Sequence, residues 1–301
     1  MADLYLDHVL IAVHDLERSR HTFADLLGFT VTSEGVHPGR GTHNRLIVFG
    51  PEYLELIAIR DATEARADRP QMLDFLKRRQ GLHMFALGSR HLEATVADIR
   101  RRGGRISDPV DGARTGAMGK GGYTWRSAHL DPADTPGSAT FIIQHNHTIQ
   151  QRYTEPANPT VHANGVTGIF SLSLAVKDAP VAAGIWSRTF GIPIAPVPSS
   201  SQGEGQDGGA GYQQTKRLTL ANCYLDFVSP TGDGPLASHL ETFGESPYML
   251  SLKVADPGRT VKLLEARGIT LSAPRKTGDS LRRAVPETQA EGANLEMVQA
   301  V

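Results

Sequence analysis

Residues 4–29, LYLDHVLIAVHDLERSRHTFADLLGF, join a short apolar segment ending in Ala-Val-x-Asp to an amphipathic segment that closes on a glycine. Residues 167–192, TGIFSLSLAVKDAPVAAGIWSRTFGI, repeat this order, and 14–28 align with 177–191 without a gap. A glycine directly after an amphipathic segment is typical of a helix C-terminus. The repeat therefore predicts a strand followed by a helix at two places in the chain.

Both repeats continue into further strands. RLIVFGPEYLELIAI (45–59) aligns with RLTLANCYLDFVSP (217–230), and each predicts a hairpin of two strands. Two fainter copies begin at Gly81 and Tyr248 and end in SATFIIQH and ANLEMVQ. Each of the four copies has the order strand, helix and three strands, which implies antiparallel hairpins. We therefore predict an α+β fold of four βαβββ modules rather than a doubly wound sheet.

The modules are expected to pair, because one module alone cannot bury the apolar face of its curved sheet. A polar, proline-bearing stretch at 150–164 predicts a linker between the pairs. The chain then divides into a first domain at 1–149 and a second at 165–301, each with a cup-shaped mixed sheet.

Composition limits the classes of function. The formal net charge of the 301 residues is −1, without blocks of lysine or arginine, which argues against nucleic acid and membrane as partners. No apolar run approaches the roughly 20 residues of a membrane helix, and the single cysteine excludes an internal disulfide. We expect a cytoplasmic protein with a small-molecule substrate, and the composition is compatible with a homodimer. Eleven of the twelve histidines lie at or before His162, so chemistry is expected in the first half.

One carboxylate interrupts an apolar strand. In YLELIAI (53–59), strand alternation puts Glu55 on the same face as Tyr53 and Ile57. Such a glutamate either faces water or points inward, where it must be paired or bound to a metal. His8 similarly shares a face with Leu10, as a hydrogen-bonded core histidine or as a ligand.

The order of modules, with His8 in DHVLIAVHDLE and Glu55 in YLELIAI, resembles the vicinal-oxygen-chelate superfamily. HPGRGTHN, TWR and HANG narrow the resemblance to its large glyoxalase-like domain family. The resemblance implies a cup with one divalent metal, held by the first and last strands of each paired module, which stabilises an enolate, peroxide or alkoxide. His8 and Glu55 match the two ligands of the first module.

The sequence does not decide which residues of the second module would bind the metal. Gln144, on the last strand, is a neutral oxygen ligand, and His83 is the histidine of the first strand. Aligning Ala86 with Ala12 places Leu82 at the ligand position instead of His83. With His83, the set would hold Fe(II), Mn(II), Ni(II) or Zn(II).

The loop VHPGRGTHN supplies the remaining candidates of the first module. Gly39 and Gly41 permit close backbone approach, and the loop places donors and acceptors at the mouth of a strand. We predict the following roles: His37 and His43 in acid–base catalysis, Thr42 and Asn44 in substrate binding. The alternative is a simple turn with solvated histidines.

Trp125 and Arg126 are the substrate-binding candidates of the second module, as an aromatic wall and a carboxylate clamp. Neighbouring strand residues face opposite ways, so only one of them is expected in the pocket.

In the second domain, the ligand-equivalent positions hold Ser171, Asp226, Met249 and Glu296, without a histidine, which predicts a degenerate site. A metal in an apolar cup with imidazoles at its rim favours a lyase or isomerase that abstracts a proton from a small carbonyl or carboxylate compound, with His37 or Glu55 as the catalytic residue that moves the proton. The alternatives are an Fe(II) ring-cleaving dioxygenase using His8, His83 and Glu55, and a non-catalytic small-molecule-binding or resistance protein.

Overall fold

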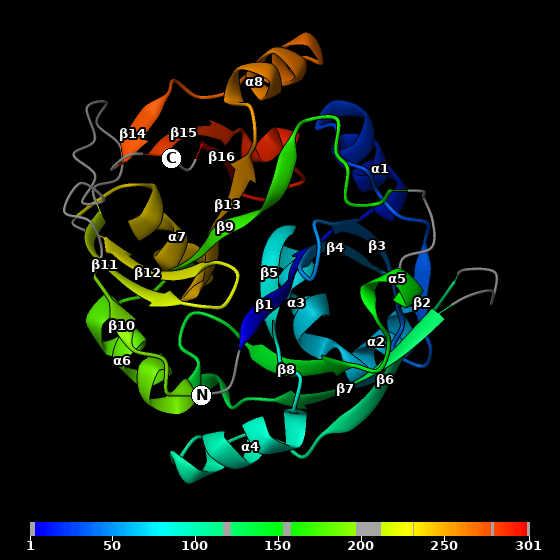
Figure 1. Ribbon diagram of the computed structural model, residues 1–301, viewed down its shortest axis with the longest axis vertical. Helices are drawn as coiled ribbons and strands as arrows, with labels where there is room; N and C mark the ends of the chain where they lie inside the picture. The colour runs from blue at the N-terminus through cyan, green and yellow to red at the C-terminus, as the bar shows by residue number, and fades with distance from the viewer. Residues whose placement is uncertain are drawn as a thin grey trace.

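A computed structural model describes residues 4–116, 122–152, 158–196, 212–230, 232–277 and 280–299. It confirms four βαβββ modules arranged as two curled eight-stranded sheets (Figure 1). The first module comprises β1 (Tyr5–Ala12), α1 (Leu16–Arg20) with its π-helical continuation η1 (His21–Leu26), β2 (Gly35–His37), β3 (Thr42–Val48) and β4 (Tyr53–Ile59). The second comprises β5 (Gly81–Gly88), α4 (Leu92–Arg101), β6 (Val110–Gly116), β7 (Gly122–His129) and β8 (Thr140–His145).

The third module comprises β9 (Val166–Ala175), α6 (Ala179–Phe190), β10 (Ile194–Ala195), β11 (Tyr212–Thr219) and β12 (Tyr224–Pro230). The fourth comprises β13 (Ser246–Val254), α8 (Pro257–Ala266), β14 (Arg275–Thr277), β15 (Ser280–Val285) and β16 (Leu295–Gln299). The connections between modules carry α2 (Ala62–Asp68), α3 (Pro70–Arg78), α5 (Ile149–Arg152) and α7 (Pro235–Phe243). Within modules, η2 (Pro132–Asp134) lies between β7 and β8, and η4 (Glu287–Gln289) between β15 and β16.

The repeated Ala-Val-x-Asp motif has a local structural cause. The Asp15 carboxylate accepts hydrogen bonds from the first backbone N–H groups of α1, and Asp178 does the same for α6. Gly28 and Gly191 follow the two helices with φ of 80° and 67°, a backbone conformation that favours glycine. The aspartate and the glycine therefore mark the start and the end of the same helical unit in both halves.

The first two modules form a closed barrel in the strand order β1-β4-β3-β2-β6-β7-β8-β5. Closure comes from β2 and β6, where Gly35 pairs with Gly116 and Val36 with Thr115. The sheet is mixed, because β1 and β4 run parallel while β1 and β5 run antiparallel. In Figure 1 the barrel lies at the right, and α4 packs on its outer face.

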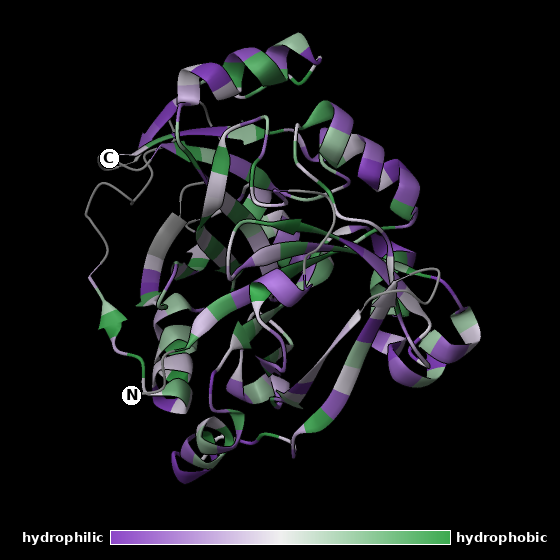
Figure 2. Ribbon diagram, turned by 45° about the vertical axis from the view of Figure 1, so that its right-hand side comes forward, coloured by the Kyte–Doolittle hydropathy of each residue, from purple (hydrophilic) through white to green (hydrophobic). Residues whose placement is uncertain are grey.

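The other two modules form a second sheet in the order β10-β11-β12-β9-β13-β16-β15-β14, which stays open across the described residues. One hydrophobic core runs through both halves, and the Phe85 ring of β5 stacks at 5.7 Å on Trp186 of α6. Figure 2 shows the corresponding hydropathy pattern, with hydrophilic and hydrophobic residues alternating on the peripheral helices. Of the predicted linker at 150–164, residues 153–157 lie outside the described part of the chain.

The linker is anchored where the structure describes it. The backbone N–H of Thr30 donates to Nδ1 of His162, and Nε2 of His162 lies 3.1 Å from the carbonyl oxygen of Val48. Burial lowers the pKa of His162 to about 4. Among the described helices, none is both long and apolar enough to cross a bilayer.

Candidate active site

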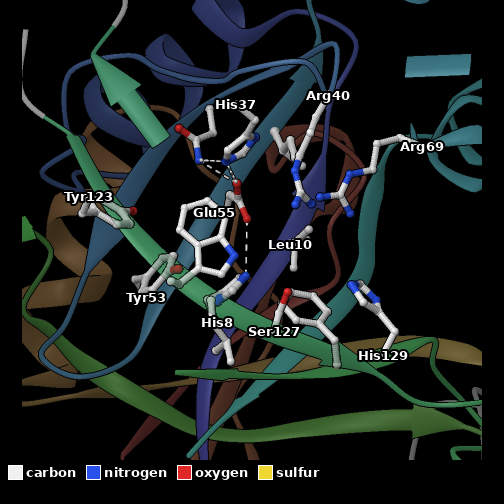
Figure 3. A pocket seen from close by; sticks show the side chains of 15 residues that line it. His8, Leu10, His37, Arg40, Tyr53, Glu55, Arg69, Tyr123, Ser127 and His129 are labelled. Carbon is white, nitrogen blue, oxygen red and sulfur yellow. Dashed lines mark hydrogen bonds and ion pairs between the residues drawn. The ribbon is translucent and has the colours of Figure 1, made fainter. Parts of the chain in front are cut away.

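The barrel encloses a small cavity between β1, β3, β4, β7 and β8, with about 40 Å³ of space for the centres of water molecules (Figure 3). Its lining consists of the following residues: His8, Leu10, His37, Arg40, Asn44, Tyr53, Glu55, Ile57, Arg69, Tyr123, Trp125, Ser127, His129, Phe141 and Ile143. The cavity thus combines one carboxylate, three imidazoles and two guanidinium groups with aromatic and aliphatic walls.

Glu55 lies at the centre of this cavity. Glu55 shares one face of β4 with Tyr53 and Ile57, which also line the cavity. The glutamate is only 5% exposed. The amide of Asn44 donates to Oε1 over 2.6 Å, and Nε2 of His8 lies 3.5 Å from Oε2. Glu55 therefore points inward, and the water-facing alternative does not apply.

A hydrogen-bond chain sets the protonation of His37. Nε of Arg114 donates to Oδ1 of Asn44 over 2.8 Å, which fixes the orientation of the amide, so its Nδ2 faces both Glu55 and Nε2 of His37. Because Nδ2 can only donate, Nε2 of His37 accepts, and its Nδ1–H donates to the Thr42 hydroxyl over 2.8 Å. Burial lowers the pKa of His37 to about 4, so the ring is neutral near pH 7.

The same contacts keep Glu55 ionised. Burial alone would raise the pKa of Glu55, but the facing His37 and His8 rings and the Asn44 hydrogen bond outweigh burial and lower it. More distant support comes from Arg69, whose positive charge acts in the same direction. A buried carboxylate that stays charged near neutral pH can accept a proton or bind a cation.

Sequence reasoning missed the partner of His8. Asp7 is fully buried at an irregular point in the pairing of β1 with β5, and its Oδ1 lies 2.7 Å from Nδ1 of His8 and 3.1 Å from Nε2 of His145. Burial raises the pKa of Asp7, but His145 and His8 outweigh it and keep the pKa well below its usual range. Asp7 thus holds the Nδ1 proton of His8 and turns Nε2 toward Glu55. The sequence signal for this partner was that an aspartate, Asp7, directly precedes His8.

The second module does not supply matching ligands. β1 and β5 have equal length, so Met84 takes the place of His8. Glu55 of β4 pairs with Leu10, two residues after His8. Phe141 of β8 pairs with Ala86, two residues after Met84. Phe141 therefore takes the place of Glu55. Neither side chain has the oxygen, nitrogen or thiolate ligand that these metals prefer.

The two predicted ligands of the second module lie outside the cavity. His83 occupies an irregular point of β5, packs at 4.6 Å on the Phe75 ring, and has a pKa lowered by burial to about 4. Gln144 follows Ile143, which takes the inward face, and its Oε1 accepts from the N–H of Leu92 at the start of α4. Both side chains therefore have structural partners of their own.

The donor set fits a metal only in part. His8 backed by Asp7 has the arrangement of a metal-ligating histidine. Its Nε2 lies 3.5 Å from Oε2 of Glu55, close to the spacing of about 3.4 Å between two ligands of a tetrahedral ion. Yet no group of three or more His, Cys, Asp or Glu residues in the described ranges could hold an ion. The four-ligand site that the resemblance implies is therefore not formed by these residues.

The remaining candidates divide between the two faces of the barrel wall. Trp125 lines the cavity with its indole edge-to-face on His37, whereas Arg126 lies outside, paired with Glu93. His43 also lies outside, with Nδ1 2.8 Å from Glu34. Thr42 is buried behind His37 rather than at the cavity surface. The predicted arginine clamp is therefore not at Arg126.

Two other arginines occupy the cavity instead. Arg40 comes from the glycine-rich loop, and Arg69 from the junction of α2 and α3. Arg40 was part of the loop motif, but nothing local distinguishes Arg69 from the other arginines of its segment.

In the second sheet, Asp226 and Glu296 lie at the last-strand positions that match Glu55 and Phe141 of the barrel. Asp226 pairs with Ser173 and Glu296 with Ser251, the same registers as in the barrel. Arg217 donates two hydrogen bonds to Asp226, at 2.6 and 2.8 Å. Arg282 and Arg275 pair with Glu296. Arginines therefore neutralise both carboxylates.

A barrel of two βαβββ modules around an inward carboxylate defines a protein of the vicinal-oxygen-chelate class. A family model described as a glyoxalase-like domain matches residues 6–190. The chain belongs to this glyoxalase-like domain family.

Comparison with solved structures supports the fold. A hypothetical protein from Staphylococcus aureus has a TM-score of 0.68 at 15% identity, with 98% of each chain covered. A mutant of 4-hydroxymandelate synthase from Streptomyces coelicolor has a TM-score of 0.62 at 13% identity, covering 99% of this chain and 93% of that one. A xylose isomerase-like TIM barrel/4-hydroxyphenylpyruvate dioxygenase fusion protein has a TM-score of 0.61 at 12% identity, covering 99% and 49%. No curated protein matches the sequence. At these identities the likeness shows the fold alone.

Proposed function

We propose that this protein is a lyase or isomerase that removes a proton from carbon beside a carbonyl or carboxyl group of a small substrate, with Glu55 as the base. The observation that supports this role is the environment of the carboxylate. Asn44 holds Oε1, while Oε2 is turned toward His8 inside the enclosed cavity. A buried, oriented and ionised carboxylate is suited to proton transfer.

The lowered pKa of Glu55 limits what it can deprotonate. A weakly basic carboxylate needs a C–H bond whose electron pair can move onto a neighbouring oxygen. The proton passes to Oε2, and the C–H electron pair forms the C=C bond of an enolate. The guanidinium groups of Arg40 and Arg69 stabilise the negative charge that develops on the substrate oxygen. Return of the proton to a neighbouring atom gives an isomerase, whereas departure of a leaving group gives a lyase.

Hydrogen exchange in D₂O tests the assignment without knowledge of the substrate. Small carbonyl and carboxylic acids with an acidic C–H are incubated with the enzyme and followed by NMR. We expect catalysed exchange that falls by about 10²–10⁴-fold in Glu55→Gln. Asp226→Asn, at the matching position of the second sheet, is the control and retains exchange. Equal exchange in Glu55→Gln and in the wild-type protein would refute the role of Glu55.

Metal dependence is tested separately, because His8 and Glu55 supply only two protein ligands. The protein is incubated with Zn(II), Mn(II), Ni(II) or Fe(II), passed through a desalting column and subjected to elemental analysis. A retained ion that His8→Ala and Glu55→Ala both abolish would assign the two side chains to a metal site. Failure to retain any ion would leave proton transfer to the groups of the protein.

A requirement for dioxygen distinguishes a dioxygenase from a lyase or isomerase. Exchange and turnover under strict anaerobiosis support the lyase or isomerase. Turnover that requires dioxygen and Fe(II), and stops with Zn(II), would instead support a dioxygenase, for which the fold likeness is the only argument. Ligand binding without exchange or turnover would support a non-catalytic binding protein.

A further inference from the structure

We propose that Arg40 and Arg69 bind a carboxylate of the substrate, so that the site is specific for small carboxylic acids of two to three carbons. This inference rests on the proposed function, because it concerns the same cavity. It adds the chemical class, the size and the orientation of the molecule that Glu55 would act on.

The first argument is the charge around the two guanidinium groups. Figure 3 shows them side by side, with Glu55 between them and the two tyrosines. Asp68 is the acidic side chain that both share, at 3.0 Å from Nε of Arg69 and 4.0 Å from Nη1 of Arg40. Asp68 is not part of the cavity lining, where two arginines and one carboxylate lie besides the imidazoles. The two guanidinium groups therefore present paired hydrogen-bond donors to an anion in the cavity.

The second argument is the incomplete hydrogen bonding of Arg69. Its Nε is buried and makes no well-directed hydrogen bond within the described residues, although Asp68 is close enough for an ion pair. Burial and the neighbouring charge of Arg40 both lower the pKa of Arg69. Asp68 offsets part of this cost from outside the cavity lining, and the planar fork of the Arg69 guanidinium matches a carboxylate.

The third argument is size. The 40 Å³ available in the cavity corresponds to about three water molecules, well below the roughly 150 Å³ cavity that admits benzene. Trp125 and Phe141 form part of the cavity wall. The substrate is therefore small, with its carboxylate at Arg40 and Arg69 and its reacting carbon toward Glu55.

The chain carries its own reporter for a binding test. It has two tryptophans, of which Trp125 lines the cavity and Trp186 is buried against Phe85 outside it. Glycolate and its neutral amide, glycolamide, are titrated while tryptophan emission and Tm are recorded. We expect glycolate to change the emission and raise Tm, with glycolamide binding at least about tenfold more weakly. Trp125→Phe should remove the emission change, because Trp186 lies outside the cavity.

Arginine variants locate the binding site. Arg40→Gln and Arg69→Gln should each weaken glycolate binding at least about tenfold. Arg126→Gln is the matched control, because Arg126 lies on the outer face of the same wall, and it should bind like the wild-type protein. If Arg69→Gln does not fold, Arg40→Gln on the loop still tests the proposal. Equal binding of glycolate and glycolamide, no binding of either, or unaltered binding in both cavity variants would overturn it.

The results separate this inference from the proposed function. Arginine-dependent glycolate binding without any Glu55-dependent exchange would support the carboxylate site and refute the base. Glu55-dependent exchange that persists unchanged in Arg40→Gln and Arg69→Gln would support the base and refute the carboxylate site.

Discussion

Gly35 shows how a single residue controls the chain of hydrogen bonds behind Glu55. A Cβ atom at this position would lie 2.1 Å from the Arg114 guanidinium carbon, which crosses directly over the glycine to reach Asn44. Any side chain here therefore displaces Arg114. Without Arg114, the amide of Asn44 loses the contact that orients it toward Glu55 and His37.

We predict that Gly35→Ala lowers the free energy of unfolding by about 1–3 kcal/mol, because the guanidinium must move out of a packed position. Urea unfolding measures this change. The comparison is with Gly35→Ala in an Arg114→Ala background, where the clash is absent and the cost should be smaller. An identical cost in both backgrounds would show that the arginine is not the cause.

At the scale of elements, α2 positions the loop that carries His37 and Arg40. The carbonyl oxygen of Gly41 accepts hydrogen bonds from the N–H groups of Arg60 and Asp61, and its own N–H donates to Glu64. Gly41 has φ of 64°, and a Cβ there would lie 2.3 Å from the backbone nitrogen of Ala65. The close approach expected of this loop is therefore real at Gly41.

Gly39 provides the matched control, since it has φ of 70° but a Cβ added there would meet no atom of the described residues within 4 Å. We predict that Gly39→Ala costs about 1 kcal/mol of stability through backbone strain alone. Gly41→Ala should cost about 1–3 kcal/mol more, because the loop must separate from α2. It should also weaken glycolate binding, since Arg40 is the preceding residue. Equal effects of the two substitutions in chemical unfolding would argue against the contact with α2.

At the scale of the whole molecule, several buried histidines make stability depend on pH. Burial lowers the pKa of His37, His83, His162 and His239 to about 4, against an ordinary value of 6.5. Between these values the unfolded chain binds more protons than the folded one, so stability rises with pH. Each histidine thus destabilises the fold as pH falls below 6.5, by at most about 3 kcal/mol once pH reaches 4.

We predict a marked fall in the free energy of unfolding from pH 7 to pH 4, measured by urea unfolding. His162→Gln should make this fall shallower, because an amide can both accept from Thr30 and donate to Val48 without binding a proton. His14→Gln, at an exposed position, is the matched control. The same slope in His162→Gln and in the wild-type protein would contradict the prediction.

The four modules and the inward Glu55 and His8 could be predicted because local patterns determine them. Strand alternation decides which face a side chain takes, and the aspartate and glycine at the two ends decide where each helix lies. The second module was harder, because a period of two turns a one-residue error in alignment into a change of face. The pairing of β5 with β1 is irregular at His83. Met84, and not Leu82 or His83, takes the ligand position.

By itself, therefore, the sequence determined the α+β module repeat, its class, and the central carboxylate and imidazole. Only the tertiary structure decided which distant groups meet them. Arg69 arrives from a helical connection, Arg114 reaches Asn44 near the strand pair that closes the barrel, and Asp7 joins His8 to His145. These contacts depend on barrel closure and on an irregular strand pairing, which place residues far apart in the chain within hydrogen-bond distance and leave no periodic pattern in the sequence.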